Sequence, residues 1–341
     1  MTKKIALIPS YEPDSDFTYL LKDLKKLDFD IIVVNDGSGD KYDSIFDNLK
    51  DYSTVLSYNV NHGKGYALKT GLKYIKEKYV KDYVVVTMDC DGQHTVEDTN
   101  KICLEAINDK NALILGKRLR NENTPKKSKF GNSFTSFFLS VSTGLKIYDT
   151  QTGLRAFSDN IIDKFIYIEG DRYEYEMNML LACPANGISI KEIEISTIYF
   201  NNNSNSHFKA LKDSLRIYKE LLKFVFSSFL SFIIDYLLYT IFSAFTFNFV
   251  MANILARIIS SIINYTFNRK IVFKSNSNIY ISIIQYFSLA AVILLLNTSI
   301  LSVFVNYFNI DKYIAKFITE VILFIFSWII QKRIIFKRKY N

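Results

Sequence analysis

Two carboxylates one residue apart, Asp89 and Asp91, are the side chains whose type and spacing most directly suggest chemistry in this sequence. They follow a β-branched run at residues 84–87, which is typical of a strand buried on both faces of a parallel sheet. Ligands of open α/β sheets bind just outside the carboxyl ends of the strands, and carboxylates suit a hard divalent cation that bridges phosphates. A solvated acidic turn is the alternative interpretation, and a lone Asp-x-Asp would favour it.

The segments around this pair repeat one arrangement, in which an apolar strand ends in polar or glycine-rich sequence. Apolar residues with helical spacing separate these strands. The alternation predicts a doubly wound α/β domain with its site along one edge of the sheet. The further strands are predicted at residues 5–8, 31–34, 54–57, 112–115 and 188–195.

The turn Asn61-His62-Gly63-Lys64-Gly65 opens one of the predicted helices. Its spacing is not that of a P-loop, because the Gly-x-x-x-x-Gly-Lys pattern is absent. It nevertheless places backbone N–H groups and one lysine at a helix N-terminus, where an anion is favoured. We therefore expect an anionic group to bind near this turn.

A basic stretch at residues 117–129 contains six Lys or Arg residues and one acid, and ends in Lys129. The aromatic residues that follow, at positions 130, 134, 137 and 138, share one helical face. A core helix and a helix on the bilayer surface, with basic residues over lipid phosphates, both explain this pattern.

Composition divides the chain of 341 residues into two halves, which suggests two domains. Residues 1–222 read as a soluble globular sequence, whereas residues 224–335 are almost entirely apolar. The formal net charge is +8, and beside long apolar segments this indicates a membrane surface and no nucleic-acid partner. The three cysteines have no metal-ligand or disulfide spacing and are expected to be reduced. The first apolar run is too short for a signal peptide, so we expect the first half to stay in the cytoplasm.

The apolar half is predicted to cross the membrane four times, near residues 224–246, 249–267, 284–305 and 313–331. Residues 207–223 are predicted to form an amphipathic helix at the membrane surface. Lys and Arg are concentrated in the second connection and at the C-terminus, which places both termini in the cytoplasm by the positive-inside rule. The chain is thus predicted to be a multi-pass protein of the cell membrane.

The apolar half also contains an internal repeat. Residues 264–274 match residues 327–337, an offset (327 − 264) of 63 residues. Two helical hairpins are therefore predicted to repeat in parallel. The charged residues within the spans, Asp235, Arg257 and Glu320, are expected to face the interior of the helix bundle, because a charge facing lipid costs about 2.5–3.5 kcal/mol on insertion scales. Asp235 is the expected partner of Arg257.

An ordered set of short motifs occurs in residues 4–223. In chain order they are Pro9-x-Tyr11-x-Pro13, Asn35-Asp36-Gly37-Ser38, Asn61-x-Gly63-Lys64-Gly65, Asp89-x-Asp91-Gly92-Gln93-His94, Gly116-Lys117-Arg118, Asp149-x-Gln151-Thr152-Gly153-x-Arg155-x-Phe157 and Glu174-x-Glu176. Together they resemble glycosyltransferase family 2, in the branch of dolichol-phosphate mannose synthase and bacterial polyprenyl-phosphate glycosyltransferases. The apolar half, with its repeated motif, resembles the GtrA-like membrane family, which is thought to move or present polyprenyl-linked sugars.

The resemblance implies a GT-A-like (Rossmann-like) nucleotide-sugar domain over residues 1–206, the juxtamembrane helix over 207–223, and an all-α, GtrA-like membrane domain over 224–341. It also implies roles for site residues. Arg118 and Arg155 would face a phosphate of the acceptor or the donor, and Lys129 would lie beside the acceptor phosphate. A Mg²⁺ or Mn²⁺ cofactor would be held by Asp89, Asp91 and Gln93. The nucleotide-sugar would be bound by Pro9, Tyr11, Glu12, Asp36, Lys64 and Asp89.

Two departures from the family pattern qualify these roles. Asn35 stands where many relatives carry a second Asp, which leaves the choice between UDP- and GDP-linked donors open. The Gln-x-x-Arg-Trp motif of processive synthases is absent, since the single Trp is Trp328. We therefore expect one sugar per acceptor.

The predicted chemistry needs no general base, because a polyprenyl phosphate acceptor is already ionised at neutral pH. The site must align two phosphate groups and offset their charge, from which we infer an inverting, metal-dependent transfer. The predicted topology places this transfer at the cytoplasmic face, and the resemblance implies a role in cell-envelope glycan or glycosylation pathways. Asp91, Arg118 and Arg155 are the expected catalytic residues. The alternative is a flippase of polyprenyl-linked sugars with a regulatory nucleotide-sugar-binding domain. The oligomeric state is left open.

Overall fold

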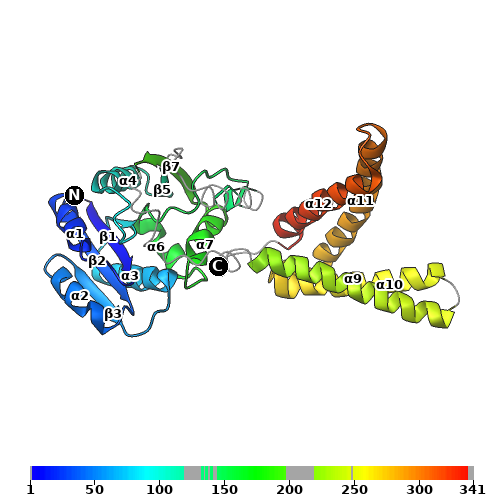
Figure 1. Ribbon diagram of the computed structural model, residues 1–341, viewed down its shortest axis with the longest axis horizontal. Helices are drawn as coiled ribbons and strands as arrows, with labels where there is room; N and C mark the ends of the chain where they lie inside the picture. Colours follow the sequence, from blue (N-terminus) through cyan, green and yellow to red (C-terminus); the bar gives the residue numbers. More distant parts are fainter. Residues whose placement is uncertain are drawn as a thin grey trace. The chain divides into compact units, whose positions relative to one another are not determined.

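The computed structural model describes residues 2–118, 132–133, 135–136, 139–140, 144–196, 219–246 and 249–336. The chain divides into two compact units, residues 1–217 and 218–341 (Figure 1). Most of the predicted juxtamembrane helix and the predicted boundary at residue 206 lie outside the described residues. The last residues of that segment, 219–223, belong to the first helix of the second unit.

A seven-stranded sheet organises the first unit, in the order β3-β2-β1-β4-β6-β5-β7 (Figure 1). The predicted strands are confirmed. Their bounds are β1 Lys3–Ser10, β2 Phe29–Asp36, β3 Thr54–Tyr58, β4 Tyr83–Thr87, β5 Ala112–Arg118 and β7 Ser189–Ile195, and the remaining strand is β6 Arg155–Ser158.

The sheet is mixed, in an α/β domain of the predicted class. Strand β6 runs antiparallel to both of its neighbours, β4 and β5, and the other described pairings are parallel. The sequence analysis named no strand at residues 155–158. Four residues that begin with an arginine give no strand signal, and their position is set by burial between two apolar strands.

Helices cover both faces of the sheet and form two apolar layers (Figure 1). Alternate residues of β4 enter opposite layers, with Val85 in one and Val84 and Val86 in the other. One layer is formed with α3 Lys64–Lys78, α6 Asp159–Ile166 and α7 Glu174–Ala182, and the other with α1 Phe17–Lys26, α2 Asp43–Leu49 and α4 Val96–Asn108.

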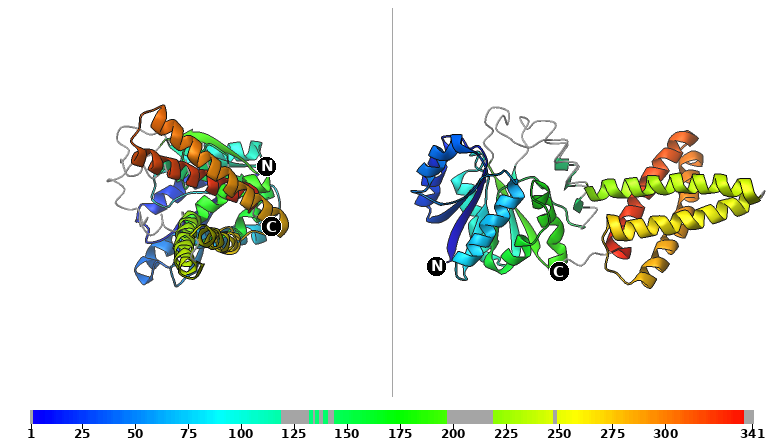
Figure 2. Two further views of the ribbon diagram at one scale, coloured as in Figure 1. Left: turned by 90° about the vertical axis from the view of Figure 1, so that its right-hand side faces the viewer. Right: turned by 90° about the horizontal axis from the view of Figure 1, so that it is seen from below.

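The second unit consists of two antiparallel helical hairpins (Figure 2). The first pairs α9 Lys219–Thr246 with α10 Phe249–Phe267, and the second pairs α11 Ile279–Asn306 with α12 Lys312–Ile330. Each hairpin ends in a π-helical turn, η4 Asn268–Val272 or η5 Gln331–Ile335, and these turns are the two copies of the repeated motif.

Two segments in the described residues are long and apolar enough to cross a membrane, Leu222–Phe242 and Ile279–Asn306. All four predicted spans are helical, whereas crossing by each of them stays a prediction. The third helix begins five residues earlier than expected, because the side chain of Asn278 accepts hydrogen bonds from the backbone N–H groups of Tyr280 and Ile281 and so caps it.

The hairpins meet at the two π-helical turns through neutral amides. The Asn268 Nδ2 donates to Gln331 Oε1 at 3.0 Å and to Asn264 Oδ1 at 2.8 Å. Phe273 and Phe336, also related by the repeat, stack beside this pair with their ring centroids 5.5 Å apart. The predicted repeat thus forms the junction of the two hairpins.

Asp235 lies within the first hairpin, where its carboxylate accepts a hydrogen bond from Ser260 Oγ at 2.8 Å. It therefore turns toward α10, as expected of an intramembrane charge. The side chains of its predicted partner Arg257 and of Glu320 lie outside the description of the structure.

Candidate active site

The carboxyl ends of β1, β2, β4 and β5 meet along one edge of the sheet, as the sequence predicted for the site. The antiparallel β6 adds its amino end to this edge, because its register pairs Arg155 with Thr87 of β4 and with Leu115 of β5. The loops that precede and follow these strand ends therefore converge on Asp89 and Asp91.

Lys64 bridges two acids that come from different elements. Its Nζ lies 2.6 Å from Asp89 Oδ1, after β4, and 2.9 Å from Glu176 Oε1, in the first turn of α7. Burial alone would lower the pKa of Lys64, but the charges of Asp89 and Glu176 outweigh it and hold that pKa above its usual value. Burial would likewise raise the pKa of Asp89, and Lys64 and His94 hold it below its usual value.

Two glycines allow the turn before α3 to come this close to α7. A Cβ on Gly63 would lie 2.6 Å from the carbonyl oxygen of Asp171, and one on Gly65 would lie 2.5 Å from Cβ of Tyr175. Gly63 also has a φ of 112°, which L side chains rarely adopt. The positions on both sides of Lys64 therefore require glycine.

Asp36 holds the same turn from the other side. This carboxylate is 3% exposed. It accepts hydrogen bonds from Tyr58 Oη at 2.8 Å, from the His62 N–H at 2.9 Å and from the Gly63 N–H at 2.8 Å. Burial, followed by the hydrogen bond to Asp36, raises the pKa of Tyr58. Asp36 thus positions the glycine-lysine turn, and its predicted contact with the nucleotide stays a prediction.

The other residues of the predicted nucleotide pocket lie where β1 ends. Pro9 pairs with Val34 within the sheet, and Tyr11 and Glu12 follow the strand. The Glu12 N–H donates to Ser38 Oγ at 2.9 Å, which ties the end of β1 to the loop after β2. Glu12 has a φ of 52°, an uncommon value for a residue other than glycine and one that often marks functional sites.

The loop at residues 149–154 lies against Asp89. A Cβ on Gly153 would lie 2.2 Å from Asp89 Oδ2, and the Gly153 carbonyl accepts a hydrogen bond from Thr87 Oγ1 at 3.0 Å. Only glycine leaves room for the carboxylate here. Sequence reasoning included Gly153 in a motif but did not identify this contact.

Arg155 is buried, with 1% of its surface exposed. Its Nε donates to the Thr152 carbonyl at 3.0 Å and its Nη1 to the Glu176 carbonyl at 2.6 Å, while its Nη2 lies 3.4 Å from the Thr150 carbonyl. All three guanidinium nitrogens have main-chain acceptors. In this structure Arg155 joins the 149–154 loop to α7, and its predicted contact with phosphate stays untested.

Arg118 is held by a carboxylate. Its Nε donates to Asp149 Oδ2 at 2.7 Å and its Nη2 to Asp149 Oδ1 at 2.9 Å, a bidentate pair. Burial would raise the pKa of Asp149, but Arg118 lowers it. Lys129, the third residue expected at the acceptor phosphate, lies outside the described residues, so the structure does not test this group.

Residues 6–169 match glycosyl transferase family 2, and residues 223–336 match the GtrA/DPMS transmembrane domain. The UDP-N-acetylglucosamine–dolichyl-phosphate N-acetylglucosaminyltransferase of Methanococcus voltae is 31% identical over 214 residues, which cover 57% of this chain and 84% of that protein. An uncharacterized protein of Methanocaldococcus jannaschii is 33% identical over 199 residues, which cover 57% of this chain and 80% of that protein. The chain belongs to glycosyl transferase family 2.

This family 2 glycosyltransferase thus has the predicted GT-A-like α/β unit followed by a helical membrane unit. Among solved structures, glucosyl-3-phosphoglycerate synthase from Mycobacterium tuberculosis, in complex with Mn²⁺, UDP-glucose and phosphoglyceric acid, is similar at 13% identity with a TM-score of 0.48. The similarity covers 65% of this chain and 78% of that one. The matched transmembrane domain and the two long apolar helices make the glycosyltransferase a membrane protein.

The acidic pair of the glycosyltransferase fits a divalent cation. Burial, followed by the negative charge of Asp89, raises the pKa of Asp91, so a cation between the two carboxylates would be favoured. The Gln93 N–H donates to Asp91 Oδ1 at 3.1 Å and orients it. No group of three or more His, Cys, Asp or Glu side chains that could by itself hold a metal ion occurs in the described residues. Two carboxylates completed by substrate phosphates are a usual Mg²⁺ arrangement.

Glu176 is the site residue that sequence reasoning missed. It was noted within a Glu-x-Glu motif but given no role. The signal in the sequence was an acid within an apolar helix. In the structure Glu176 is 8% exposed and lies between the buried residues Tyr175 and Met177. A buried acid needs a cationic partner, but sequence alone does not reveal that Lys64, on another helix, is that partner.

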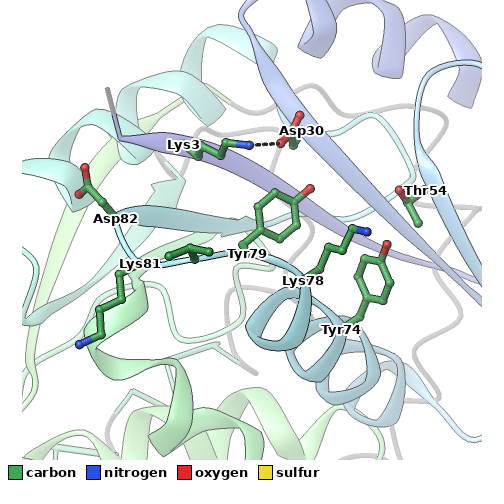
Figure 3. Close-up of a pocket in the computed structure, with 9 residues that line it drawn as sticks. Lys3, Asp30, Thr54, Tyr74, Lys78, Tyr79, Lys81 and Asp82 are labelled. Carbon is green, nitrogen blue, oxygen red and sulfur yellow. Dashed lines mark ion pairs between the residues drawn. The ribbon is translucent and has the colours of Figure 1, made fainter.

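A cavity of about 600 Å³ lies away from this site, at the amino ends of β1, β2 and β3 (Figure 3). Lys3, Lys78 and Tyr79 are among its lining residues, and Lys3 pairs with Asp30 at 3.8 Å. Asp89 and Asp91 lie at the opposite ends of the strands. The cavity is therefore not part of the candidate active site.

Proposed function

We propose that this enzyme transfers one sugar from a UDP- or GDP-linked donor to polyprenyl phosphate, with inversion at the anomeric carbon. The observation that carries the proposal is the placement of Asp89, Asp91 and Lys64 together at the carboxyl end of β4 in a family 2 glycosyltransferase. The relative from Methanococcus voltae, whose name specifies a dolichyl phosphate acceptor, supports this class of acceptor.

Asp89, Asp91 and Gln93 would hold Mg²⁺ or Mn²⁺ on the donor diphosphate, and the Gln93 N–H would orient Asp91. When bound, the metal offsets the negative charge that develops on the leaving diphosphate. The chain's own residues position the reactants. Asp36 and the two glycines fix the turn that carries Lys64, and Arg155 fixes the loop that lies against Asp89.

The acceptor needs no proton removed, because a phosphate monoester is ionised at neutral pH. The site therefore requires alignment and charge compensation rather than a general base. We infer a single in-line displacement at the anomeric carbon, which inverts the configuration of the sugar. Arg118 and Lys129 would assist through the acceptor phosphate.

The membrane unit would hold the active site at the bilayer surface, where the acceptor phosphate lies. The concentration of Lys and Arg after the second and fourth helices supports a cytoplasmic location for both termini and for the catalytic unit. The product would enter cell-envelope glycan or glycosylation pathways.

The proposal is tested with purified full-length protein in lipid vesicles, a panel of radiolabelled nucleotide sugars and polyprenyl phosphate. We expect one labelled sugar to pass to the lipid only when Mg²⁺ or Mn²⁺ is present, with an anomeric configuration opposite to that of the donor. Asp91→Asn is the matched inactive variant. Transfer at an equal rate in excess chelator would contradict the metal role, and failure of every donor with polyprenyl phosphate would contradict the acceptor.

A further inference from the structure

The ammonium group of Lys64 lies where a divalent cation bound to Asp89 would be expected. It contacts Asp89, a proposed metal ligand, at 2.6 Å, and its side chain is only 15% exposed. Among the described residues, no other Lys or Arg lies within ion-pair distance of Asp89, and His94 Nε2 lies at 3.7 Å. One lysine therefore compensates most of the charge on this carboxylate.

Glu176 gives Lys64 a second anionic partner that is not a proposed metal ligand. The Glu176 Oε1 lies 2.9 Å from Lys64 Nζ and 4.0 Å from Arg155 Nε. Lys64 can consequently leave Asp89 without becoming an unpaired buried cation. Its backbone is fixed by the close packing of the glycines on either side, whereas the flexible four-carbon stem of a lysine carries a compact charge that can change partners.

We propose that Lys64 is a resident cation, which pairs with Asp89 while the site is empty and passes to the donor diphosphate when the divalent cation takes its place. Glu176 keeps the lysine within reach throughout the exchange. This inference rests on the proposed function, since it assumes a metal-bound diphosphate at Asp89. It adds that metal and donor bind cooperatively, because each ligand removes the pairing that opposes the other.

The exchange differs from a permanent Asp89–Lys64–Glu176 ion triplet in a measurable way. A permanent triplet would only stabilise the fold and orient Asp89, so removal of the lysine would weaken metal binding or leave it unchanged. A resident cation competes with the metal. Its removal would therefore strengthen the binding of metal alone and weaken the binding of the diphosphate.

The test measures Mn²⁺ binding by electron paramagnetic resonance on the purified full-length protein in detergent, first without nucleotide and then with UDP or GDP. For Lys64→Met we expect Mn²⁺ alone to bind about tenfold more tightly than in the wild type. We expect the gain in Mn²⁺ affinity caused by the nucleotide to fall from tenfold or more to about threefold or less, within the usual range of such couplings. Lys64→Arg should have the opposite effect on Mn²⁺ alone and weaken its binding several-fold, because a guanidinium pairs with a carboxylate through two hydrogen bonds.

Lys69→Met is the matched control. Lys69 lies on the same helix, is 18% exposed and pairs at 2.6 Å with Asp171, a carboxylate outside the acidic pair. Its removal should leave Mn²⁺ affinity unchanged. Where Lys64→Met does not fold, as judged by circular dichroism, Lys64→Gln replaces it, with the same expected tightening of Mn²⁺ binding.

Unchanged or weaker Mn²⁺ binding in folded Lys64→Met, or no weakening in Lys64→Arg, would overturn the exchange while leaving the proposed function intact. Absence of Mn²⁺ binding in the wild type would overturn both. Cooperative binding of Mn²⁺ and nucleotide that is lost in Lys64→Met, in a protein that transfers no sugar to polyprenyl phosphate, would support the exchange and overturn only the proposed acceptor.

Discussion

The two units of this glycosyltransferase satisfy their buried polar groups with different chemistry. The catalytic unit pairs full charges, as in the contacts of Lys64 with Asp89 and of Arg118 with Asp149. The junction of the membrane hairpins instead pairs neutral amides, with Asn268 donating to Asn264 and Gln331. Charge is thus concentrated in the unit that must bind a charged substrate.

The difference follows from the free-energy cost of burying a charged or an unpaired polar group in each environment. A charge within a bilayer costs several times more than a neutral amide, whereas an unpaired amide still costs enough to fix which helices meet. In the catalytic unit Lys64 offsets the cost of burying Asp89, and the proposed binding of a phosphate and a cation there gives this carboxylate a function. Arg269 is charged within the membrane unit, and it lies in a terminal π-helical turn, where its Nη1 donates to Ser282 Oγ at 2.7 Å.

The comparison predicts its largest effect where a charge is removed from the acidic pair. Asp91→Asn should lower the rate of sugar transfer by about a thousandfold, since loss of one carboxylate weakens a metal whose contribution is several kcal/mol. Transfer rates and circular dichroism measure the loss and the intact fold. The exposed Asp51→Asn is the control. Near wild-type turnover with the metal still required would remove Asp91 from the site.

A smaller loss of transfer activity is expected when the Asp89 carboxylate keeps its charge but is displaced. Gly153→Ala would place a methyl group 2.2 Å from Asp89 Oδ2 and move that carboxylate. Transfer should fall by about a hundredfold, the usual consequence of a displacement near 1 Å.

Gly71→Ala is the matched control for this displacement, because its methyl group would lie 2.1 Å from Leu7 Cδ1 in the apolar core. It should lower the thermal unfolding temperature and leave the rate per folded molecule unchanged. Equal losses of activity per folded molecule in both variants would show that Gly153 acts through the fold and not through Asp89.

Substitutions in the amide junction of the membrane hairpins should change the stability of the protein rather than its activity. Asn268→Leu removes the bonds to Asn264 and Gln331, and should destabilise the membrane unit by about 1–2 kcal/mol, near the upper end of values for hydrogen bonds between membrane helices. Unfolding in mixed detergent micelles measures it.

The control is Asn306→Leu. Among the described contacts, the amide of Asn306 bonds only to Ser302 within its own helix. The double variant Asn268→Leu with Gln331→Leu should recover part of the loss, since Gln331 is then no longer an amide without its Asn268 partner, and Asn264 Oδ1 still accepts from Tyr286 Oη at 2.8 Å. If the double variant lost more stability than the two single variants added together, the junction would not be a pairwise amide contact.

The smallest effect concerns pH. Arg118 holds the pKa of Asp149 below its usual value, so this pair contributes stability above the unfolded-state pKa of about 4, and the contribution is lost as pH falls through the lower folded-state pKa. The difference in unfolding free energy between the wild type and Asp149→Asn should therefore be constant near neutral pH and shrink below about pH 4. Denaturant titrations at pH 7, 5 and 3 measure it. A difference that grows on acidification would contradict the ion pair.

Much of this architecture is determined by local sequence. Residues 84–87 are three valines and a threonine, all β-branched, and such a segment favours a buried strand. The motif at 264–274 recurs 63 residues later, and two similar helix ends fold in the same way, here as π-helical turns. The polar residues after each strand could be assigned to one sheet edge because parallel strands end together.

Only the tertiary structure decided the partners of the long charged side chains. The expected contact of Arg155 with phosphate stays a prediction, whereas its contacts with main-chain carbonyls follow from its position on β6, an antiparallel strand without a sequence signal. Lys64 was assigned to an anion, and the fold supplies two carboxylates from separate elements. Local sequence determines which backbone conformation a residue adopts, whereas a flexible charged side chain pairs with whatever the packing of distant elements brings within about 3 Å.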